Sequence, residues 1–396
     1  MISVDAAQAL CLGLVRAGEA EVVDLADALG RVLAAPLRAK RDQPPFSASA
    51  MDGYAVQSGQ ATTGSTFDVI GEAAAGHGWD GHVGPGQAVR IFTGAPVPDG
   101  ATRVIIQENV TRNGDQITLT EPLKDNINIR PQGADFTRDF TLDAPRALTS
   151  ADLALIAAMN HARVAVIRRP KVALISTGDE LLMPGGDPGP DQIIASNVFA
   201  LQAMLAQTGA EAHVLPIAPD TPEALDTTLA QAADWGADII VTIGGASVGD
   251  HDLVAPALDR FGVTRSFHKI AMRPGKPLMA GAKGRVAFLG LPGNPVSAVV
   301  CGHLFLLPMV RRALGLDDVL PPALTARLTA PLPAGGPRAH YMRARFDEGD
   351  AARQVTAFDR QDSSMLTVLA EANCLLLRPI DDAPKAAGDA VTIYPI

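Results

Sequence analysis

A glycine-rich segment with carboxylates follows an apolar segment in the second half of the chain. Gly244 and Gly245 come directly after residues 237–243, and Asp250 and Asp252 close the same loop, "GGASVGDHD". Free backbone N–H groups in such a turn can hold phosphate. Carboxylates would repel that anion unless a divalent cation lay between them, and Mg²⁺ is commonly held by one or two carboxylates plus phosphate. Taken alone, a tight turn with a capping aspartate is the simpler interpretation.

Three further strand-like segments are followed by similar residues. Asp179 and Glu180 follow "KVALIS", Asp220 follows "EAHVLPI", and "LPGNPVSA" follows "RVAFLG". The carboxyl ends of parallel strands share one edge of an open α/β sheet, and ligands bind beyond that edge. Four such loops together favour a binding site over four unrelated turns.

Basic residues in "FHKIAMRPGKP" add a second candidate feature. Lys269, Arg273 and Lys276 fall within eight residues of a chain whose net charge is −10. They form a local patch suited to an anion, although a solvated basic turn fits the charges equally well. Ser297 is expected in the first turn of a helix, another position suited to an anion. An ordinary helix begun by proline is the commoner explanation of that stretch alone.

The composition limits the class of protein. With 396 residues and 47% hydrophobic residues, two to four domains with sizeable cores are expected. An acidic chain is a poor candidate for coating nucleic acid or an anionic membrane. The three cysteines are far apart, which fits a reducing compartment. No signal peptide is expected, and the longest apolar run, residues 296–310, predicts a buried helix rather than a membrane span. We therefore expect a soluble cytoplasmic protein.

The texture of the chain changes several times. Residues 1 to about 40 are predicted to be helical, and about 54 to 145 to be β-rich, with Asn113-Gly114 as the turn of a hairpin. From 171 to 317, strands alternate with helices, which predicts a parallel sheet covered on both faces. After about 318, five short strands predict a small barrel or sandwich.

Six motifs in a fixed order carry a resemblance to a known family. They are "FSASAMDGYAV", "IFTGAPVPDGAT", "STGDEL", "TIGGASVGDHD", "AMRPGKP" and "LPGNPVSA". Together they resemble the MoeA-type molybdopterin molybdenumtransferases, a family that includes the gephyrin E domain, over nearly the whole chain. The resemblance implies a doubly wound parallel-sheet α/β domain of molybdopterin-binding type, with three smaller domains. The expected domains are an elongated linking domain (1–45 and 140–169), a β-rich domain (46–139), the α/β domain (170–317) and a C-terminal β-barrel (318–396).

The resemblance also implies an activity. Members of this family insert molybdate into adenylylated molybdopterin and release AMP in a reaction that needs Mg²⁺ or a similar ion. It further implies a homodimer with shared active sites, in which one subunit contributes its β-rich domain and the other its α/β domain and barrel. A molybdopterin adenylyltransferase and recipient molybdoenzymes are expected as partners; nucleic acid and membrane are not.

The family's site residues map onto positions of this chain. Asp220 and Asp252 would hold the metal, Ser247 the adenylate phosphate, and Lys276, Arg343 and Ser363 the molybdate. The positions implied for catalysis are Asp52, Thr93, Asp135, Glu180, Lys269 and Arg273. Those implied for substrate binding are Gly244, Gly245, Ser247, Gly249, Lys276, Pro292, Gly293, Pro295, Ser297, Arg343 and Ser363. The chain departs from the family's common residues at Ser47, Ala134 and Ala195, and Arg273 replaces a frequent lysine.

Two other functions stay open at this point. A molybdopterin adenylyltransferase would resemble the α/β domain alone, and the additional domains and "AMDGYA" count against it. A non-catalytic molybdopterin-binding or scaffolding protein would have the same fold, and the retained Asp52, Asp220 and Asp252 count against it.

Overall fold

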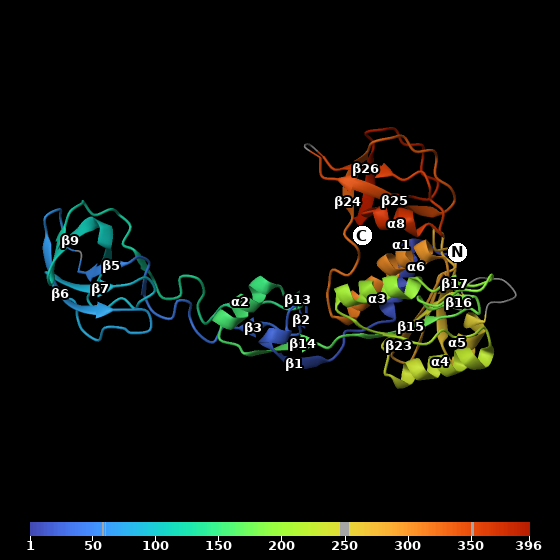
Figure 1. Cartoon of the computed structure of the whole chain (residues 1–396), viewed down its shortest axis with the longest axis horizontal. Coiled ribbons are helices and arrows are strands. Elements are labelled where there is room, and N and C mark those ends of the chain that lie inside the picture. Colours follow the sequence, from blue (N-terminus) through green and yellow to red (C-terminus); the bar gives the residue numbers. More distant parts are fainter. Residues whose placement is uncertain (58, 60, 246–252, 350–351) are drawn as a thin grey trace.

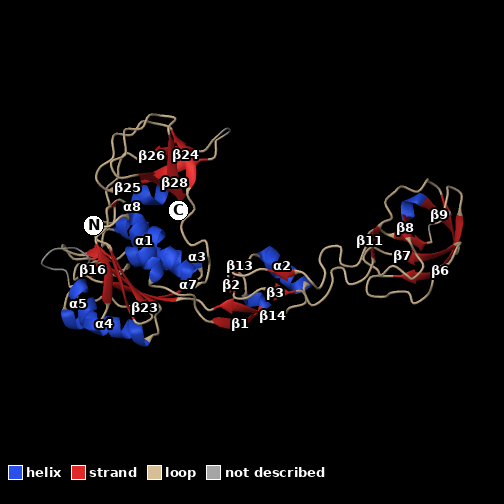
Figure 2. Ribbon diagram, turned by 180° about the vertical axis from the view of Figure 1, so that it is seen from behind, coloured by secondary structure: helices blue, strands red, loops and turns tan. Residues whose placement is uncertain are grey.

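Four bodies follow one another along an elongated molecule (Figure 1). The structure is a computed structural model that describes residues 1–57, 59, 61–245, 253–349 and 352–396. We call the bodies the distal β body (48–130), the central body (20–38 and 141–167), the α/β body (4–13 and 171–313) and the barrel (324–395). The distal β body lies at one end, and the α/β body and the barrel lie together at the other, as the reverse view also shows (Figure 2).

The α/β body is built on a mixed sheet. Its strand order is β18-β15-β19-β23-β22-β20, and the first four strands are parallel. The bounds are β18 Glu211–Val214, β15 Lys171–Ser176, β19 Ile239–Ile243, β23 Val286–Leu291, β22 Met279–Lys283 and β20 Thr264–His268. The predicted parallel sheet is thus confirmed in its centre, whereas β22 and β20 add an antiparallel edge.

Helices cover both faces of this sheet, as the sequence predicted. Alternate residues of β15 point to opposite faces, so Val172 and Leu174 join one core and Ala173 and Ile175 the other. The first core is covered by α1 Val4–Gly13, α3 Asn197–Thr208, α6 Pro295–Cys301 and α7 Leu307–Ala313. The second is covered by α4 Pro222–Asp234 and α5 Val254–Phe261.

Local sequence sets the ends of several of these helices. Thr221 caps α4 by accepting the Ala224 N–H, and Pro222 follows at the first helical position. Gly209 ends α3 with a φ of 92°, which glycine adopts at little cost. Ser196 occupies the N-cap position of α3, but its side chain makes no capping hydrogen bond.

The apolar run at residues 296–310 lies in the core. It forms α6, a π-helical turn η3 Gly302–Leu306, and α7. Pro308 lacks the N–H that a regular helix would need there, which fits the wider turn just before it. By length and composition Pro295–Ala313 could cross a membrane, but 83% of its most apolar window is buried inside the fold. It is a core helix, as predicted.

The distal β body contains a six-stranded sheet in the order β8-β5-β7-β6-β10-β9. The elements are β4 Ala48–Ser49, β5 Gly53–Val56, β6 Thr66–Ala73, β7 Gln87–Ile91, β8 Arg103–Ile106, η2 Gln107–Asn109, β9 Val110–Asn113, β10 Gln116–Leu119 and β11 Ile129–Arg130. The hairpin turn is displaced by one residue from its prediction. Asn113 pairs with Gln116, so Gly114 and Asp115 form the loop, and Gly114 carries the positive φ of 60°.

The prediction that residues 1 to about 40 are helical was wrong for most of this range, which the central body shows. Only α1 is an α-helix in this range, and η1 Leu25–Asp27 is a short 3₁₀ turn. Val22 and Val23 lie in a strand paired with residues 164–165, because β-branched residues fit a paired strand and tertiary pairing outweighs weak helical periodicity. The elements are β1 Ala20–Asp24, β2 Val32–Leu33, β3 Leu37–Arg38, β12 Thr141–Leu142, β13 Arg146–Ala147, α2 Ser150–Ala158 and β14 Arg163–Ile167.

The N-terminal helix belongs to a different body from the one expected. The sequence prediction put residues 1–45 in the linking domain. In the structure, Val4, Ala7 and Cys11 are buried in the core that also contains α3, α6 and α7. The helix therefore packs with the α/β body, and the chain enters the central body only after it.

The C-terminal strands form a closed barrel among the described residues. Strand β25 pairs with both β26 and β27, which closes the order β25-β26-β24-β28-β27. The bounds are β24 Leu324–Leu328, β25 Ala339–Asp347, β26 Gln354–Ala357, α8 Leu366–Glu371, β27 Cys374–Arg378 and β28 Ala390–Pro395. All five predicted strands are present, and closure favours the barrel over the sandwich. Strand β21, Met272–Arg273, pairs with β25 and joins the α/β body to the barrel.

Candidate functional site

The order of the strands defines where a ligand would bind. The chain runs from β15 to β18 on one side and then returns to β19 on the other side of β15. Ligands of open α/β sheets bind beyond the carboxyl ends of the strands at such a switch point. The loops after β15 and β19 meet there, because the Thr177 N–H donates to the Ile243 carbonyl oxygen at 3.1 Å. We call this region the strand-end edge.

The turn after β19 can be built only from glycine. Gly244 and Gly245 have φ values of 97° and 61°. A Cβ atom on Gly244 would lie 2.9 Å from the Thr177 carbonyl oxygen, and one on Gly245 would lie 2.5 Å from Val254 Cγ2. The glycines thus bring this turn against the β15 loop. Ser247, Gly249 and Asp252 lie outside the described residues, so their predicted roles stay predictions.

The loops after β15 and β18 also lie side by side. The Asp220 N–H donates to Asp179 Oδ1 at 3.1 Å, and the Gly178 N–H donates to the Ala218 carbonyl oxygen at 3.3 Å. Asp220 and Glu180 are exposed. The structure therefore places both predicted acids at the strand-end edge. It also gives Asp179, which sequence reasoning assigned no role, the task of joining two of the loops.

One of the two predicted metal ligands, Asp220, belongs to the described part of the chain. Over the described residues, no group of three or more His, Cys, Asp or Glu side chains gathers in a way that could hold a metal. Asp220 supplies a hard, exposed carboxylate, and Mg²⁺ often takes only one or two carboxylates with phosphate and water. The carboxylate of Asp220 therefore fits Mg²⁺. Asp252, its predicted partner in binding the metal, lies outside the described residues, so that pairing stays a prediction.

The start of α6 is held by contacts with a barrel loop. Asn294 Nδ2 donates to Ser363 Oγ at 3.0 Å, and the Val296 N–H donates to the Ser363 carbonyl oxygen at 3.1 Å. Asn197 Nδ2 donates to the Gly293 carbonyl oxygen at 2.6 Å. The structure thus brings Ser363 to the predicted segment 292–297. Ser297 itself is 4% exposed, so its hydroxyl does not face solvent.

The basic segment forms a loop between β20 and β22, here called the cationic loop (269–278). Lys276 and Arg273 are exposed, and Lys269 is half-buried with a φ of 75°. Among the described residues, none of these three side chains makes an ion pair or hydrogen bond. A Cβ on Gly275 would lie 2.5 Å from Cys301 Sγ, so the loop packs on α6. Arg273 is near enough to Asp362 for its charge to help lower the pKa of that carboxyl, but within the described ranges none of the three cations is held in an ion pair.

Arg343 does not take the position that the sequence suggested. Its side chain was expected to offer a fork to molybdate, but it is 0% exposed. Its Nη2 atom donates to the carbonyl oxygens of Arg360 and Asp362 at 3.3 and 3.0 Å, while Nε and Nη1 have no partner in the described part of the chain. Burial in the barrel is invisible in the motif "YMRARF". Through these hydrogen bonds, the buried Arg343 side chain fixes the backbone just before Ser363.

Asp52 and Thr93 form a pair in the distal β body. The N–H and the hydroxyl of Thr93 both donate to Asp52 Oδ1, each at 2.7 Å. The backbone bond, then the side-chain bond, and more weakly the charge of Arg90, lower the pKa of Asp52 below its ordinary value of 3.8. The motif glycine is also required, because a Cβ on Gly53 would lie 1.9 Å from the Ile105 carbonyl oxygen. The pair therefore presents an ionised carboxylate.

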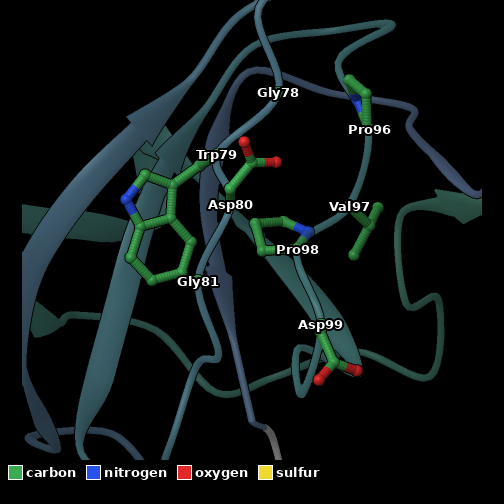
Figure 3. Close-up of a pocket in the computed structure, with 8 residues that line it drawn as sticks. All are labelled: Gly78, Trp79, Asp80, Gly81, Pro96, Val97, Pro98 and Asp99. Carbon is green, nitrogen blue, oxygen red and sulfur yellow. The ribbon is translucent and has the colours of Figure 1, made fainter.

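A shallow pocket of about 460 Å³ lies on the distal β body (Figure 3). Two loops form it, residues 78–81 and residues 96–99, and the second continues the segment that contains Thr93. Asp80 and Asp99 give its rim an acidic character, and none of the predicted site residues lines it. It is a poor match for an anionic ligand.

One chain does not bring the two groups of predicted residues together. The central body separates the distal β body from the α/β body (Figure 1). Asp135 lies in the connecting region, where its N–H donates to the Gln43 carbonyl oxygen at 2.9 Å. Asp52 and Thr93 lie at one end of the molecule. The other predicted residues that are described belong to the strand-end edge and its surrounding loops: Glu180, Asp220, Gly244, Gly245, Lys269, Arg273, Lys276, Pro292, Gly293, Pro295, Ser297 and Ser363.

Comparisons with known proteins agree with this architecture. Family models match residues 2–160 (MoeA N-terminal region, domain I and II), 173–312 (probable molybdopterin binding domain) and 325–396 (MoeA C-terminal region, domain IV). A molybdopterin molybdenumtransferase of Nostoc is 34% identical over 95% of this chain and 88% of its own length. One from Haemophilus influenzae is 34% identical over 95% and 94%.

Solved structures give the same result. A molybdopterin biosynthesis MoeA protein from Pyrococcus horikosii has a TM-score of 0.86 and 28% identity, covering 100% of this chain and 99% of that one. These matches define a multidomain protein of molybdenum cofactor biosynthesis. The chain belongs to the MoeA family of molybdopterin molybdenumtransferases, and it is a transferase.

Proposed function

We propose that this chain transfers molybdenum from molybdate to adenylylated molybdopterin and releases AMP in a Mg²⁺-dependent reaction. The observation that carries the proposal is the gathering at the strand-end edge of a glycine turn, an exposed carboxylate and three cations that make no ion pair with the described residues. Both substrates are anions, and the cationic loop can supply compensating charge because it leads into β22, whose Met279 pairs with Gly290 near the carboxyl end of β23. The names of the family relatives support this choice of substrates.

The binding roles follow from the chemistry of each group. The Gly244-Gly245 backbone with Ser247 would hold the adenylate phosphate, and Asp220 with Asp252 would hold Mg²⁺, which supplies charge neutralisation at that phosphate when bound. Lys276 and Ser363 would contact molybdate, with Lys269 and Arg273 completing the positive field. Arg343 acts through the loop that carries Ser363, since its guanidinium is buried beneath that loop.

Asp52 would act on water rather than as a strong base. Hydrolysis of the adenylate needs a water molecule directed at phosphorus, and a carboxylate with a lowered pKa accepts hydrogen bonds well but protons poorly near neutral pH. Thr93 keeps the carboxylate ionised and fixed. Orientation of the water is therefore the role that its electrostatics favour.

Assembly follows from the distance between the two groups. We propose a cytoplasmic homodimer in which the distal β body of one subunit faces the strand-end edge of the other. A molybdopterin adenylyltransferase would supply the substrate, and molybdoenzymes would receive the product. Neither nucleic acid nor membrane is proposed as a partner, given the net charge of −10.

Subunit mixing tests this proposal. Asp52→Ala and Asp220→Ala should each nearly abolish AMP release that depends on molybdate and Mg²⁺. Random mixing makes half of the dimers mixed, and one of the two sites in each mixed dimer is intact, so about a quarter of wild-type activity should return. No recovery after mass spectrometry has verified mixed dimers would reject the shared site. Binding of adenylylated molybdopterin by the wild type without any AMP release would favour a scaffolding role instead.

A further inference from the structure

A second cavity lies on the opposite edge of the α/β sheet from the strand-end edge. It has a volume of about 450 Å³, within the range of small-molecule sites. Its walls include Asp238 and Arg285, which directly precede β19 and β23, and Pro170, which precedes β15. We call it the hinge cavity, because residues 13–19 and the pair Arg168 and Pro170 also line it, and these belong to the two connections between the α/β body and the central body.

Some of the charged side chains that line the hinge cavity form ion pairs and others do not. Arg168 is satisfied, because its Nη1 and Nη2 atoms donate to the two carboxylate oxygens of Asp238 at 2.8 and 2.6 Å. Asp238 also accepts the Lys171 N–H at 2.8 Å. Arg16 and Arg285 are exposed, and neither has an ion-pair or hydrogen-bond partner within the described ranges. Two arginines from different segments, neither in an ion pair with the described residues, therefore line one cavity in a chain of net charge −10.

The remaining groups narrow the chemistry of a ligand. Guanidinium groups bind phosphate through forked hydrogen bonds, which suits a dianion between Arg16 and Arg285. Glu19 also lines the cavity and would repel a bare phosphate, but it can accept hydrogen bonds from hydroxyl groups. Leu14, Val15 and Ala313 form an apolar part of the wall that can pack against a carbon skeleton.

We propose that the hinge cavity binds a small phosphate monoester that carries hydroxyl groups, such as a sugar phosphate. Its phosphate lies between Arg16 and Arg285, and its hydroxyl groups donate to Glu19. Arg16 belongs to the segment that leads into the central body, and Arg285 to a turn of the α/β body. A bound ligand therefore joins the two bodies.

The existing contacts at this junction explain what binding would change. The Gly18 N–H donates to the Ala313 carbonyl oxygen at 2.8 Å, and the Arg168 N–H donates to the Glu19 carbonyl oxygen at 2.9 Å. These bonds already hold the connections against each other and against α7. A ligand that links Arg16 to Arg285 adds a constraint in parallel, so it should reduce local opening of both connections.

Calorimetric titration with ribose 5-phosphate tests the site. The full-length wild type should bind it saturably, and the double variant Arg16→Gln/Arg285→Gln should bind at least tenfold more weakly. Arg345→Gln is the matched control, because Arg345 is exposed and unpaired among the described residues but lies on the barrel. Glu19→Gln should reduce the preference for ribose 5-phosphate over inorganic phosphate.

Hydrogen exchange locates the bound ligand. Ribose 5-phosphate should slow exchange in peptides covering residues 13–20 and 167–171 of the wild type, and not in the double variant. Arg285→Gln alone, in an exposed turn, provides a fallback if the double variant is unstable. Absence of saturable binding to the wild type, or equal affinity in the Arg285→Gln and wild-type proteins, would overturn the proposal. Protection confined to residues 242–245 would overturn it too, by assigning binding to the strand-end edge.

Discussion

The Asp52–Thr93 pair and the strand-end edge satisfy their polar groups in opposite ways. Asp52 receives two short hydrogen bonds from one neighbouring residue of its own body. At the strand-end edge, the cations of the cationic loop make no ion pair or hydrogen bond with the described residues, and Asp220 is exposed. The hydrogen bonds of the first region are formed within the protein, whereas the cations of the second make no ion pair with the described residues and are open to an anionic ligand.

The two regions therefore suit two different roles, the orientation of a reacting water molecule and the binding of an anionic substrate. A carboxylate fixed by its own protein costs little to order when substrate arrives, so it suits a group that directs a reacting water. Unpaired cations instead gain their partner on binding, so they suit a group that raises affinity and association rate. The two regions should therefore respond differently to substitution.

The largest expected effect is on turnover. Asp52→Asn and Asp220→Asn should each lower kcat/KM for AMP release by about 100-fold or more, the scale typical of a lost electrostatic group at a reacting centre. Raising the Mg²⁺ concentration should partly restore Asp220→Asn and leave Asp52→Asn unchanged. Asp115→Asn, in the exposed hairpin turn, is the control and should retain wild-type kinetics. Equal rescue of both variants by Mg²⁺ would remove the distinction between the regions.

A smaller effect is expected on affinity. Lys276→Gln should raise the KM for molybdate about tenfold, as expected for the loss of one charge-assisted contact, with kcat nearly unchanged. Added salt should weaken molybdate binding by the wild type more than by the variant, because the variant has less charge to screen. Lys40→Gln, at an exposed position two residues after β3, should match the wild type. A fall in kcat at constant KM would instead give Lys276 a role in turnover.

The smallest effect should appear only in acid. The side-chain hydrogen bond of Thr93 is the second of the contributions that lower the pKa of Asp52, so Thr93→Val should raise that pKa toward 3.8 while the backbone contribution remains. Asp52 would then be protonated at higher pH, and the acid limb of the kcat/KM profile should move upward by less than about one pH unit. Thr93→Ser keeps the hydroxyl and should retain the wild-type profile. An unshifted profile in Thr93→Val would show that the pair does not control activity.

The lowered pKa of Asp52 also makes the stability of the fold depend on pH in the same direction, with stability lost in acid. The lowered pKa means that Asp52 contributes stability above the ordinary value of 3.8, and that this contribution disappears as the pH falls through the lower, folded-state value. Since Asp52 is only partly buried, solvent screens its interactions and only a slight change in acid unfolding is expected.

The strand-end edge was predictable because its information is local. Apolar strands followed by glycine and carboxylates specify both the sheet and the edge where Asp220 and Gly244 lie. The barrel strands were likewise visible in short apolar segments. Properties that depend on distant packing were not visible. Arg343 is buried because barrel closure covers it, and α1 leaves the expected linking domain because its apolar face fits the α/β core. The hairpin was misplaced by one residue because "RNGD" allows either Asn113-Gly114 or Gly114-Asp115 at the turn.

The position of α1 has a consequence for the order in which the chain is completed. Gln8 Nε2 donates to the Leu304 carbonyl oxygen, a bond across 296 residues. During synthesis the first helix must therefore wait, with its apolar face uncovered, until the segment around 304 has emerged. The distal β body is encoded entirely between these two points and can fold meanwhile. The α/β body is thus the first body whose synthesis begins, yet its core can be completed only late in synthesis. A nascent-chain chaperone would therefore have to cover the apolar face of α1 for longer than any later segment.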